Sequence, residues 1–304
     1  MPELPEVETI RRGLEKTVRG KTIRDVEVRL PKIVSLGPSV VSNIRKGGAK
    51  KTEIFRRDIR GHKIVSITRR SKMLLLKLSG PFTLLIHMKM TGQMIFARRG
   101  ERKTVKIFNS TASPRFLLPH KYTHVIFKFT DGSALYYNDL RQFGYLRLVS
   151  DADMDKVQDL HGFGPEPFDR SFTEEYFRSR ARSRPKLSIK QFLMDPKVVA
   201  GIGNIYSDEI LYWAKVRPAR PLRSLVTSEW HRIFLTIPKI LKDALAARGS
   251  SVGDFFQIDG KEGKYGKKHR VYGRYGQRCY TCHSEIKKIK LGGRTSSYCP
   301  NCQK

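Results

Sequence analysis

The sequence predicts an α+β protein built from three consecutive parts. Residues 21–150 contain strand-like runs bounded by Gly, Pro and Asp turns, whereas from about residue 151 the apolar residues recur at helical spacing. All four cysteines lie in the last 26 residues. We therefore expect a β-rich domain over 1–150, a helical domain over 151–268 and a small cysteine module over 269–304.

The opening stretch "MPELPEVETIRRGLEK" predicts a helix close to the start of the chain. Pro5 suits a first helical turn, and acidic residues such as Glu6 are favourable at a helix N-terminus. The following apolar residues fall on one face of that helix: Val7, Ile10, Leu14 and Val18. Pro2 and Glu3 precede the helix, so helix formation does not explain them.

Two hairpins are predicted in the β-rich part. The runs "KMLLLKL" and "FTLLIHMKM" flank the turn at Ser79-Gly80-Pro81, and "HVIFKF" and "SALYYND" flank Asp131-Gly132. "TIRDVEVRL" and "HKIVSI" are also strand-like. The basic segment 97–120 has little periodicity, which predicts either a decorated hairpin or a mobile loop.

The charge of the chain points to a polyanionic partner. The 304 residues include 60 Lys and Arg against 28 Asp and Glu, a formal net charge of +32. Nucleic acid is the leading candidate because each phosphate neutralised releases a counterion, although a ribosomal or membrane-surface protein would share this excess. No apolar run approaches a membrane span, and the acidic N-terminus is unlike a secretory signal. A cytoplasmic, nucleoid-associated location is expected.

The spacing of the cysteines predicts one structural Zn²⁺ ion. The pattern is Cys-x2-Cys-x16-Cys-x2-Cys, formed by Cys279, Cys282, Cys299 and Cys302. Two such turns complete a tetrahedral site with no open position for substrate, whereas the alternative is four reduced thiols without a role. Arg294 lies between the pairs after Gly292-Gly293, where a turn could present its guanidinium to a phosphate or simply to solvent.

The first residues of the chain could carry covalent chemistry. If Met1 is removed, Pro2 presents a secondary amine, and an α-amino group titrates near ~7.7–8.0 against ~10.4 for lysine. Its neutral form could attack a sugar C1′ and give an iminium that opens the way to elimination. The carboxyl group of Glu3 would stand beside it to move protons. The alternative is a processed terminus without a role.

The motifs occur in an order that resembles one family throughout the chain. They are "MPELPEVETIRRGL", "SKMLLLKL", "IHMKMTGQM", "NDLRQFGYL", "FGPEPF", "FLMDPKVVAGIGNIYSDEIL", "DFFQIDGKEGKYG" and the four-cysteine tail. This arrangement is similar to that of the formamidopyrimidine-DNA glycosylases, bifunctional base-excision repair enzymes of the helix-two-turn-helix class.

The resemblance implies both a fold and a reaction. The fold would be an antiparallel β-sandwich opened by one helix, a helix-two-turn-helix domain and a zinc β-hairpin, with DNA in a basic cleft. The reaction would remove 8-oxoguanine or formamidopyrimidines and then cleave the strand by β,δ-elimination. The expected partner is double-stranded DNA with oxidised bases or abasic sites. No membrane, nucleotide cofactor or catalytic metal is implied, and a monomer is expected.

The resemblance also assigns roles to individual residues. Pro2 would form the Schiff base, Glu3 would act as general acid and base, and Glu6 would support them. Lys72 would contact phosphate and assist β-elimination, and Arg294 would serve δ-elimination. Taken alone, Lys72 reads as a solvated residue at a strand edge.

A second set of residues would bind DNA. An extruded base leaves a gap in the stack, and the family fills it with a wedge whose positions fall on Met90, Arg141 and Phe143. Without the family, Met90 and Phe143 read as core residues. Asn204 and Lys190 would contact phosphates, and a loop from Gln257 to Lys264 would close over the flipped base.

The chain departs from the family pattern in places. Tyr122, which is included among the expected DNA contacts, replaces a His at a strand entry where His124 is kept. Gln191 replaces a Pro, and segment 97–120 is longer and more basic than usual. The alternatives are an endonuclease VIII-type enzyme for oxidised pyrimidines, a non-catalytic zinc-finger nucleic-acid-binding protein, and a family member that binds lesions without turnover. "PELPEVET" and "RQF" argue against the first, and the second leaves "MPELPE" unexplained.

Overall fold

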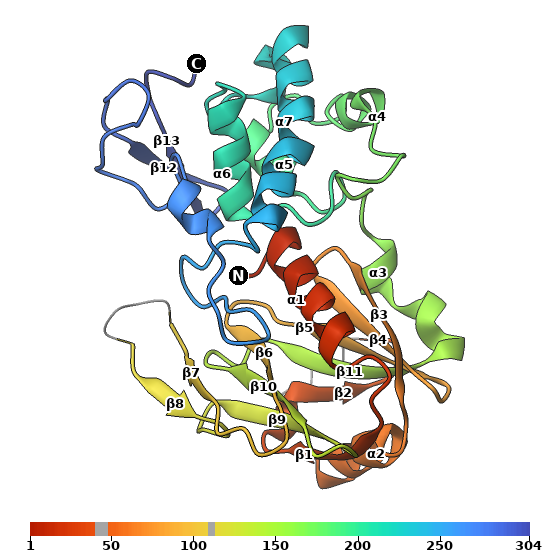
Figure 1. Cartoon of the computed structure of the whole chain (residues 1–304). Helices are drawn as coiled ribbons and strands as arrows, with labels where there is room; N and C mark the ends of the chain where they lie inside the picture. The colour runs from red at the N-terminus through yellow and green to blue at the C-terminus, as the bar shows by residue number, and fades with distance from the viewer. Residues whose placement is uncertain (40–47, 109–112) are drawn as a thin grey trace. The chain divides into compact units, whose positions relative to one another are not determined.

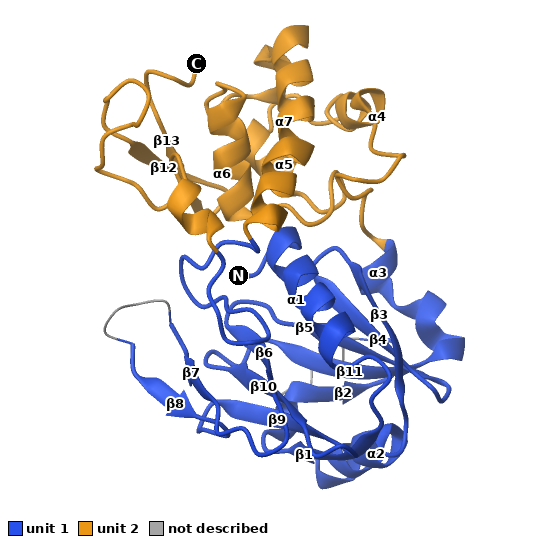
Figure 2. Ribbon diagram, in the orientation of Figure 1, with its two compact units in different colours: residues 1–161, 248–263 blue, residues 162–247, 264–304 orange. Residues whose placement is uncertain are grey.

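A computed structural model describes residues 1–39, 48–108 and 113–304 of the chain. These residues form two compact units (Figures 1 and 2). Unit 1 comprises residues 1–161 and 248–263, and unit 2 comprises 162–247 and 264–304. The α+β class is confirmed. The three-part domain division stays a prediction, and segment 248–263 groups with the N-terminal unit rather than with its neighbours in sequence.

Unit 1 contains two β-sheets that face one another across a shared core. The sheet order is β1-β9-β10-β6 in one and β2-β11-β5-β4-β3 in the other. The strands are β1 (Ile23–Val28), β2 (Val34–Leu36), β3 (Ile64–Arg70), β4 (Met73–Leu78), β5 (Phe82–His87), β6 (Gly92–Ala97), β9 (Thr123–Phe129), β10 (Ala134–Asp139) and β11 (Tyr145–Ser150). Neighbouring strands within each of these sheets run antiparallel, except for β2 and β11, which run parallel to each other. Both predicted hairpins, β4–β5 and β9–β10, are confirmed.

The largest apolar cluster of unit 1 is supplied by both sheets and by helix α1 (Leu4–Thr17). The predicted first helix is confirmed, and Val7, Ile10 and Leu14 are fully buried. Burying each such side chain contributes about 1.5–3 kcal/mol relative to leaving it exposed. The remaining helical elements of this unit are η1 (Pro31–Ile33), α2 (Ala49–Ile59), η2 (Asp151–Lys156) and α3 (Gln158–His161).

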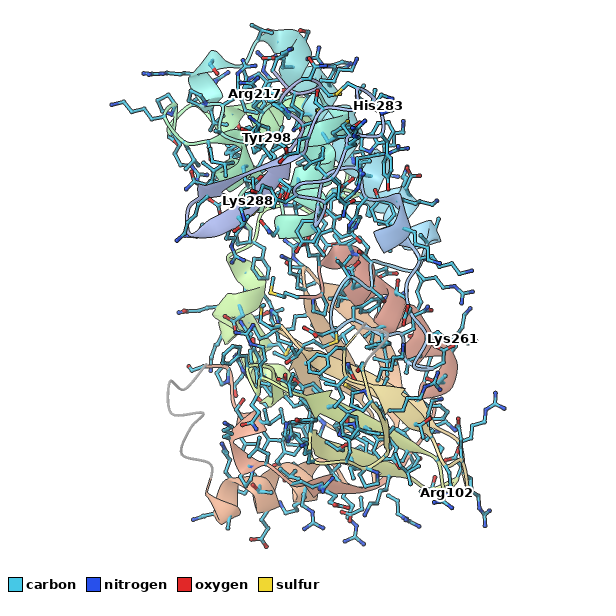
Figure 3. The ribbon with its side chains drawn as sticks, turned by 90° about the vertical axis from the view of Figure 1, so that its left-hand side faces the viewer. Arg102, Arg217, Lys261, His283, Lys288 and Tyr298 are labelled. Atoms are coloured by element: carbon cyan, nitrogen blue, oxygen red, sulfur yellow. The ribbon has the colours of Figure 1, made fainter. Side chains whose placement is uncertain are left out.

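The basic segment 97–120 contains a short hairpin. Strands β7 (Thr104–Lys106) and β8 (Arg115–Leu117) pair antiparallel, so the decorated hairpin is the correct alternative for its described residues. Residues 109–112 lie outside the described residues. Val105 and Ile107 are buried, whereas Arg102 extends into solvent (Figure 3).

Unit 2 is helical and ends in a β-hairpin. Its elements are α4 (Glu174–Ser179), α5 (Ile189–Met194), α6 (Asn204–Trp213), η3 (Leu222–Ser224), α7 (Thr227–Ala246), η4 (Tyr265–Lys268), β12 (Lys287–Leu291) and β13 (Arg294–Tyr298). Phe177, Phe192 and Trp230 pack their rings together in its core. Within the described part of the chain, every helix is too short or too polar to traverse a bilayer.

Candidate active site and nucleic-acid interface

The start of the chain is held by the first turn of α1. The Glu6 carboxylate accepts the N–H of Glu3 at 2.9 Å and the N–H of Ser250 at 2.8 Å. Glu3 is 2% exposed, and Pro2 is also buried. A carboxylate at a helix N-terminus satisfies amides that the helix leaves unpaired. Glu6 therefore fixes the backbone beside Pro2 and ties it to segment 248–263, which sequence reasoning did not foresee.

Lys72 lies in the turn between β3 and β4, directly after Ser71, whose φ is +54°. The next residue, Met73, pairs with His87 on the adjacent strand. Burial lowers the pKa of His87 to about 3, and the charge of Lys72 contributes. The imidazole is therefore neutral near pH 7, which allows its Nδ1 to accept the Lys89 N–H at 3.0 Å.

His87 is a residue that sequence reasoning missed. It ends β5 and so fixes the start of the turn that carries Met90. The signal in the sequence is a histidine at the end of an apolar strand, immediately before "MKM".

The three candidate wedge residues lie in two turns of unit 1. Met90 lies between β5 and β6 and is half-buried, whereas Arg141 and Phe143 lie between β10 and β11. Phe143 is 56% exposed, so it is not a core residue. The Arg141 guanidinium lies 4.9 Å from the centre of the Phe143 ring, within the range of a cation–π contact.

A buried carboxylate joins these two turns. Asp139, which is fully buried, accepts the hydroxyl of Thr91 through Oδ1 and the N–H of Gly144 through Oδ2 at 2.8 Å. The Thr91 hydroxyl oxygen in turn accepts the Arg141 N–H at 2.9 Å. A satisfied buried network of this kind restricts its members to one arrangement. These hydrogen bonds thus fix the turn that carries Met90 relative to the turn that carries Arg141 and Phe143.

Replacing Gly144 by Ala should disrupt the packing of these two turns. An added Cβ would lie 1.8 Å from the Tyr137 hydroxyl oxygen and 2.9 Å from the His87 carbonyl oxygen. Overpacking at such a site costs about 1–3 kcal/mol of unfolding free energy, which urea denaturation would measure. Gly253→Ala is the control, because a Cβ there meets no atom within 4 Å. Equal stability of the two variants would contradict the expectation.

Tyr122 lies immediately before β9, half-buried among other rings. Its ring centre is 6.1 Å from that of Phe116 and 6.0 Å from that of His120. Its N–H donates to His120 Nδ1 at 3.2 Å. His124 Nε2 lies 2.7 Å from the Asp139 carbonyl oxygen, so this strand entry also adjoins the Asp139 network.

In unit 2, the Asn204 side chain contacts the residue that follows Arg294, although the two positions are far apart in sequence. Asn204 begins α6, and its side-chain amide donates to the Thr295 carbonyl oxygen at 3.0 Å. Arg294 precedes Thr295 and is exposed. Gly292 and Gly293 have φ of +53° and +75°, which confirms the predicted turn before Arg294. A helix N-terminus and an exposed guanidinium are both suited to bind phosphate.

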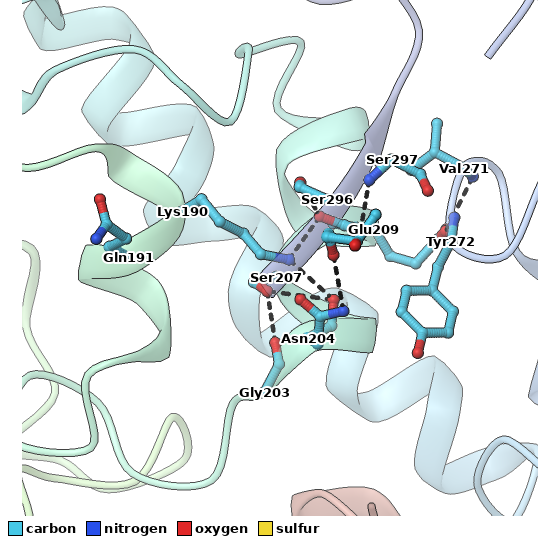
Figure 4. Close-up of polar contacts among 12 residues, drawn as sticks. Lys190, Gln191, Gly203, Asn204, Ser207, Glu209, Val271, Tyr272, Ser296 and Ser297 are labelled. Atoms are coloured by element: carbon cyan, nitrogen blue, oxygen red, sulfur yellow. Dashed lines mark hydrogen bonds and ion pairs between the residues drawn. The ribbon is translucent and has the colours of Figure 1, made fainter. Parts of the chain in front are cut away.

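Lys190 is fully buried rather than exposed beside them. Its ammonium group donates to the Asn204 carbonyl oxygen at 3.0 Å and to Asp208 Oδ1 at 2.6 Å (Figure 4). Asp208 also accepts the Ser296 hydroxyl and the Ser297 N–H. In this arrangement Lys190 has no exposed surface with which to contact a phosphate. It instead links α5, the start of α6 and strand β13.

Glu209, which follows Asp208 in α6, forms hydrogen bonds with the segment before the cysteine module. The buried Glu209 carboxylate accepts the N–H groups of Arg270, Val271 and Tyr272 at 2.9–3.0 Å (Figure 4). Burial raises the pKa values of Glu209 and Asp208, and their hydrogen bonds oppose this shift. Sequence reasoning missed both carboxylates, whose signal is an acidic pair inside an otherwise apolar helix.

Asp208→Asn should therefore destabilise the protein strongly. It would leave the Lys190 ammonium buried without its counter-charge, and breaking a buried pair in this way costs about 3–5 kcal/mol. Denaturant unfolding would measure the loss. Asp243→Asn, at an exposed position on α7, should change stability by less than about 0.5 kcal/mol. An Asp208→Asn variant as stable as the wild type would show that the Lys190–Asp208 pair contributes little to the free energy of unfolding.

The four cysteines converge on one point. Their Sγ atoms all lie within 4.8 Å of one another, with 3.8 Å between Cys279 and Cys302 and 3.3 Å between Cys282 and Cys299. A tetrahedral Zn²⁺ with Zn–S bonds near 2.3 Å would place the sulfurs about 3.8 Å apart. The cluster therefore fits one metal ion with all four positions filled by protein.

Comparisons with known proteins agree with this geometry. The family model described as the formamidopyrimidine-DNA glycosylase N-terminal domain matches residues 1–146, and that of the formamidopyrimidine-DNA glycosylase H2TH domain matches residues 163–255. The chain belongs to the formamidopyrimidine-DNA glycosylase family. A family member from Heliobacterium modesticaldum is 38% identical over 304 residues, covering 100% of both chains. One from Pelotomaculum thermopropionicum is 36% identical over 304 residues, covering 100% of this chain and 99% of its own.

Solved structures of the family have the same fold. A Lactococcus lactis glycosylase mutant in complex with DNA containing Fapy-dG has a TM-score of 0.83 and 33% identity, covering 100% of both chains. The Lactococcus lactis enzyme in complex with abasic-site DNA has a TM-score of 0.82 and 32% identity, covering 99% of both chains. The β-sandwich, the helix-two-turn-helix region and the four-cysteine hairpin described above are therefore those of formamidopyrimidine-DNA glycosylases.

Proposed function

We propose that this chain is a base-excision repair DNA glycosylase and AP lyase for oxidised purines, 8-oxoguanine and formamidopyrimidines. The observation that carries the proposal is the buried Glu3, fixed by Glu6 directly beside Pro2. The family models that match residues 1–146 and 163–255 and the family structures bound to damaged DNA support it. The endonuclease VIII-type and non-catalytic zinc-finger alternatives leave this match unexplained.

The reaction would proceed through the mature N-terminus. Removal of Met1 would free the Pro2 nitrogen, which attacks C1′ as the bond from C1′ to the base breaks, and the base leaves with the proton that the amine gives up. Glu3 would then protonate the ring oxygen O4′ as the C1′–O4′ bond opens, which leaves a C1′–N iminium. The resulting iminium acidifies C2′, and loss of a C2′ proton expels the 3′ phosphate by β-elimination. A second elimination expels the 5′ phosphate. Glu3 would move protons, Lys72 would assist the first elimination and Arg294 the second.

The DNA contacts would come from both units. Met90, Arg141 and Phe143 would fill the gap left by the flipped base, supported by the Asp139 network. Asn204 and Arg294 would hold phosphates. The buried position of Lys190 supports an indirect role for it, through the backbone of Asn204. Tyr122 would lie at the edge of the DNA contacts.

The four cysteines would hold one Zn²⁺ ion. A thiolate set of this spacing selects zinc among the common metals, and a closed site of this kind is structural. The ion would fix the hairpin that presents Arg294, and the chemistry of the reaction would stay with Pro2 and Glu3. The protein would act in the cytoplasm, on chromosomal DNA, as a monomer.

Two assays on the purified wild-type protein test the proposal. Borohydride should trap a covalent adduct with abasic-site duplex, and 8-oxoguanine should be released from its pair with cytosine faster than thymine glycol is released. A protein that shifts lesion DNA in a gel but is never trapped would be a binder without turnover. Faster release of thymine glycol would place its preference with oxidised pyrimidines.

A further inference from the structure

The basic hairpin, defined as β7, β8 and the adjoining Ile107 and Leu118, packs on a segment far away in sequence. That segment is residues 248–263, which we call the recognition loop. Val105 and Leu118 of the hairpin form a buried cluster with Ile95 of β6 and Phe256 of the recognition loop. Phe256 is 2% exposed and Val105 is 3% exposed. The hairpin and β6 thus remove the Phe256 side chain from water.

One side-chain amide joins the two segments. Gln93, in β6, donates from Nε2 to the Ile107 carbonyl oxygen at 3.3 Å and to the Asp254 carbonyl oxygen at 3.1 Å. Gln93 is 2% exposed, so these bonds form away from water, where a lost partner is costly. The position of the recognition-loop backbone is therefore coupled to that of the hairpin.

Further hydrogen bonds hold the recognition loop at other points. The Phe96 N–H donates to the Ile258 carbonyl oxygen at 2.9 Å. The Ser251 hydroxyl donates to the Phe255 carbonyl oxygen at 2.7 Å and accepts the Gly263 N–H at 2.8 Å. Lys261 is exposed at the surface (Figure 3). A loop rich in Gly and Lys is thus held by a few buried anchors.

We propose that the basic hairpin is a specificity-determining clamp that holds the recognition loop in its ordered conformation before DNA binds. This rests on the proposed function and on the family resemblance, which implies that the stretch from Gln257 to Lys264 closes over a flipped oxidised base. A loop that is already ordered does not lose conformational entropy when it captures the base. An abasic site offers no base to capture. The clamp therefore assists base release and leaves cleavage of abasic DNA unaffected.

The test compares Val105→Ala with Leu117→Ala in the full-length protein. Both residues belong to the basic hairpin, but Leu117 is 43% exposed and forms no part of the cluster with Phe256. In Val105→Ala, recognition-loop amides should exchange hydrogen for deuterium about tenfold faster in the absence of DNA. Release of 8-oxoguanine should fall about tenfold, while abasic-site cleavage stays within about twofold. Leu117→Ala should match the wild type in all three measurements.

A second variant guards against simple loss of folding. Gln93→Met keeps the length of the side chain but removes the donor shared by Ile107 and Asp254, and it should give the same pattern. Unchanged exchange in both variants, or an equal fall in base release and abasic-site cleavage, would overturn the clamp. The exchange experiment uses no substrate. A wild-type protein that released no oxidised base would therefore refute the proposed function, while exchange alone still decided the clamp.

Discussion

Insertion of one alanine between Met1 and Pro2 should reduce borohydride trapping on abasic-site DNA to background. After Met1 is removed, the new residue would convert the Pro2 nitrogen into an amide, which is not a nucleophile. The residues proposed to contact DNA, such as Arg141, Phe143 and Arg294, would be unchanged, so binding to undamaged duplex should persist. Trapping and strand cleavage are measured on a denaturing gel, with intact-mass spectrometry to show which terminus is present.

A matched variant separates the nucleophile from the acid. Glu3→Gln keeps the free secondary amine but loses the carboxyl group, so base release should fall by about 10²–10⁴-fold. Retention of full activity in the alanine-insertion protein would exclude Pro2 as the nucleophile. The same conclusion would follow if fully active wild-type enzyme carried Met1.

Removal of the metal should abolish DNA binding by unfolding the cysteine module. Structural Zn²⁺ supplies about 10–16 kcal/mol in comparable small sites. The apolar support available here is modest, consisting of Tyr212, Val271 and Ile286 around Cys279 and Cys299. Without the ion, no bond holds the four sulfur atoms together, and the turn before Arg294 loses its position. Cys302→Ser or treatment with a chelator should have the same effect.

Metal content and re-addition provide the controls for this result. We expect one zinc per chain in the purified protein and its loss together with binding in the chelated sample. Zn²⁺ should restore binding, whereas Mg²⁺, which prefers oxygen ligands, should not. Full DNA binding by a zinc-free protein would show that the cysteine hairpin stays folded without the metal.

Local pattern predicted several elements correctly, because their stability depends on neighbours in sequence. Helix α1 follows from the spacing of Val7, Ile10 and Leu14, and the β4–β5 and β9–β10 hairpins follow from their turn residues. The cysteine cluster follows from spacing alone. The catalytic and DNA-binding roles drawn from the resemblance stay predictions until the variants are measured.

Long-range partners could not be read from the sequence. In the sequence, Lys190 resembles a surface lysine, because nothing nearby shows that it pairs with Asp208. Glu6 likewise resembles an ordinary first-turn residue, because its partner Ser250 is far away in sequence. The Gly and Lys content of residues 257–264 gives no sign of what holds the recognition loop in place. Its anchors, such as Phe256, are apolar residues whose partners lie on other strands.

The discontinuous make-up of unit 1 has a consequence for biosynthesis. Ser250 and Phe256 reach the ribosome exit long after the two sheets, because the whole of α4 to α7 is translated in between. A nascent chain that stops before residue 250 lacks both the Ser250 N–H that donates to Glu6 and the Phe256 side chain that belongs to the cluster with Ile95. Unit 1 therefore reaches its final form only after most of the polypeptide has been made.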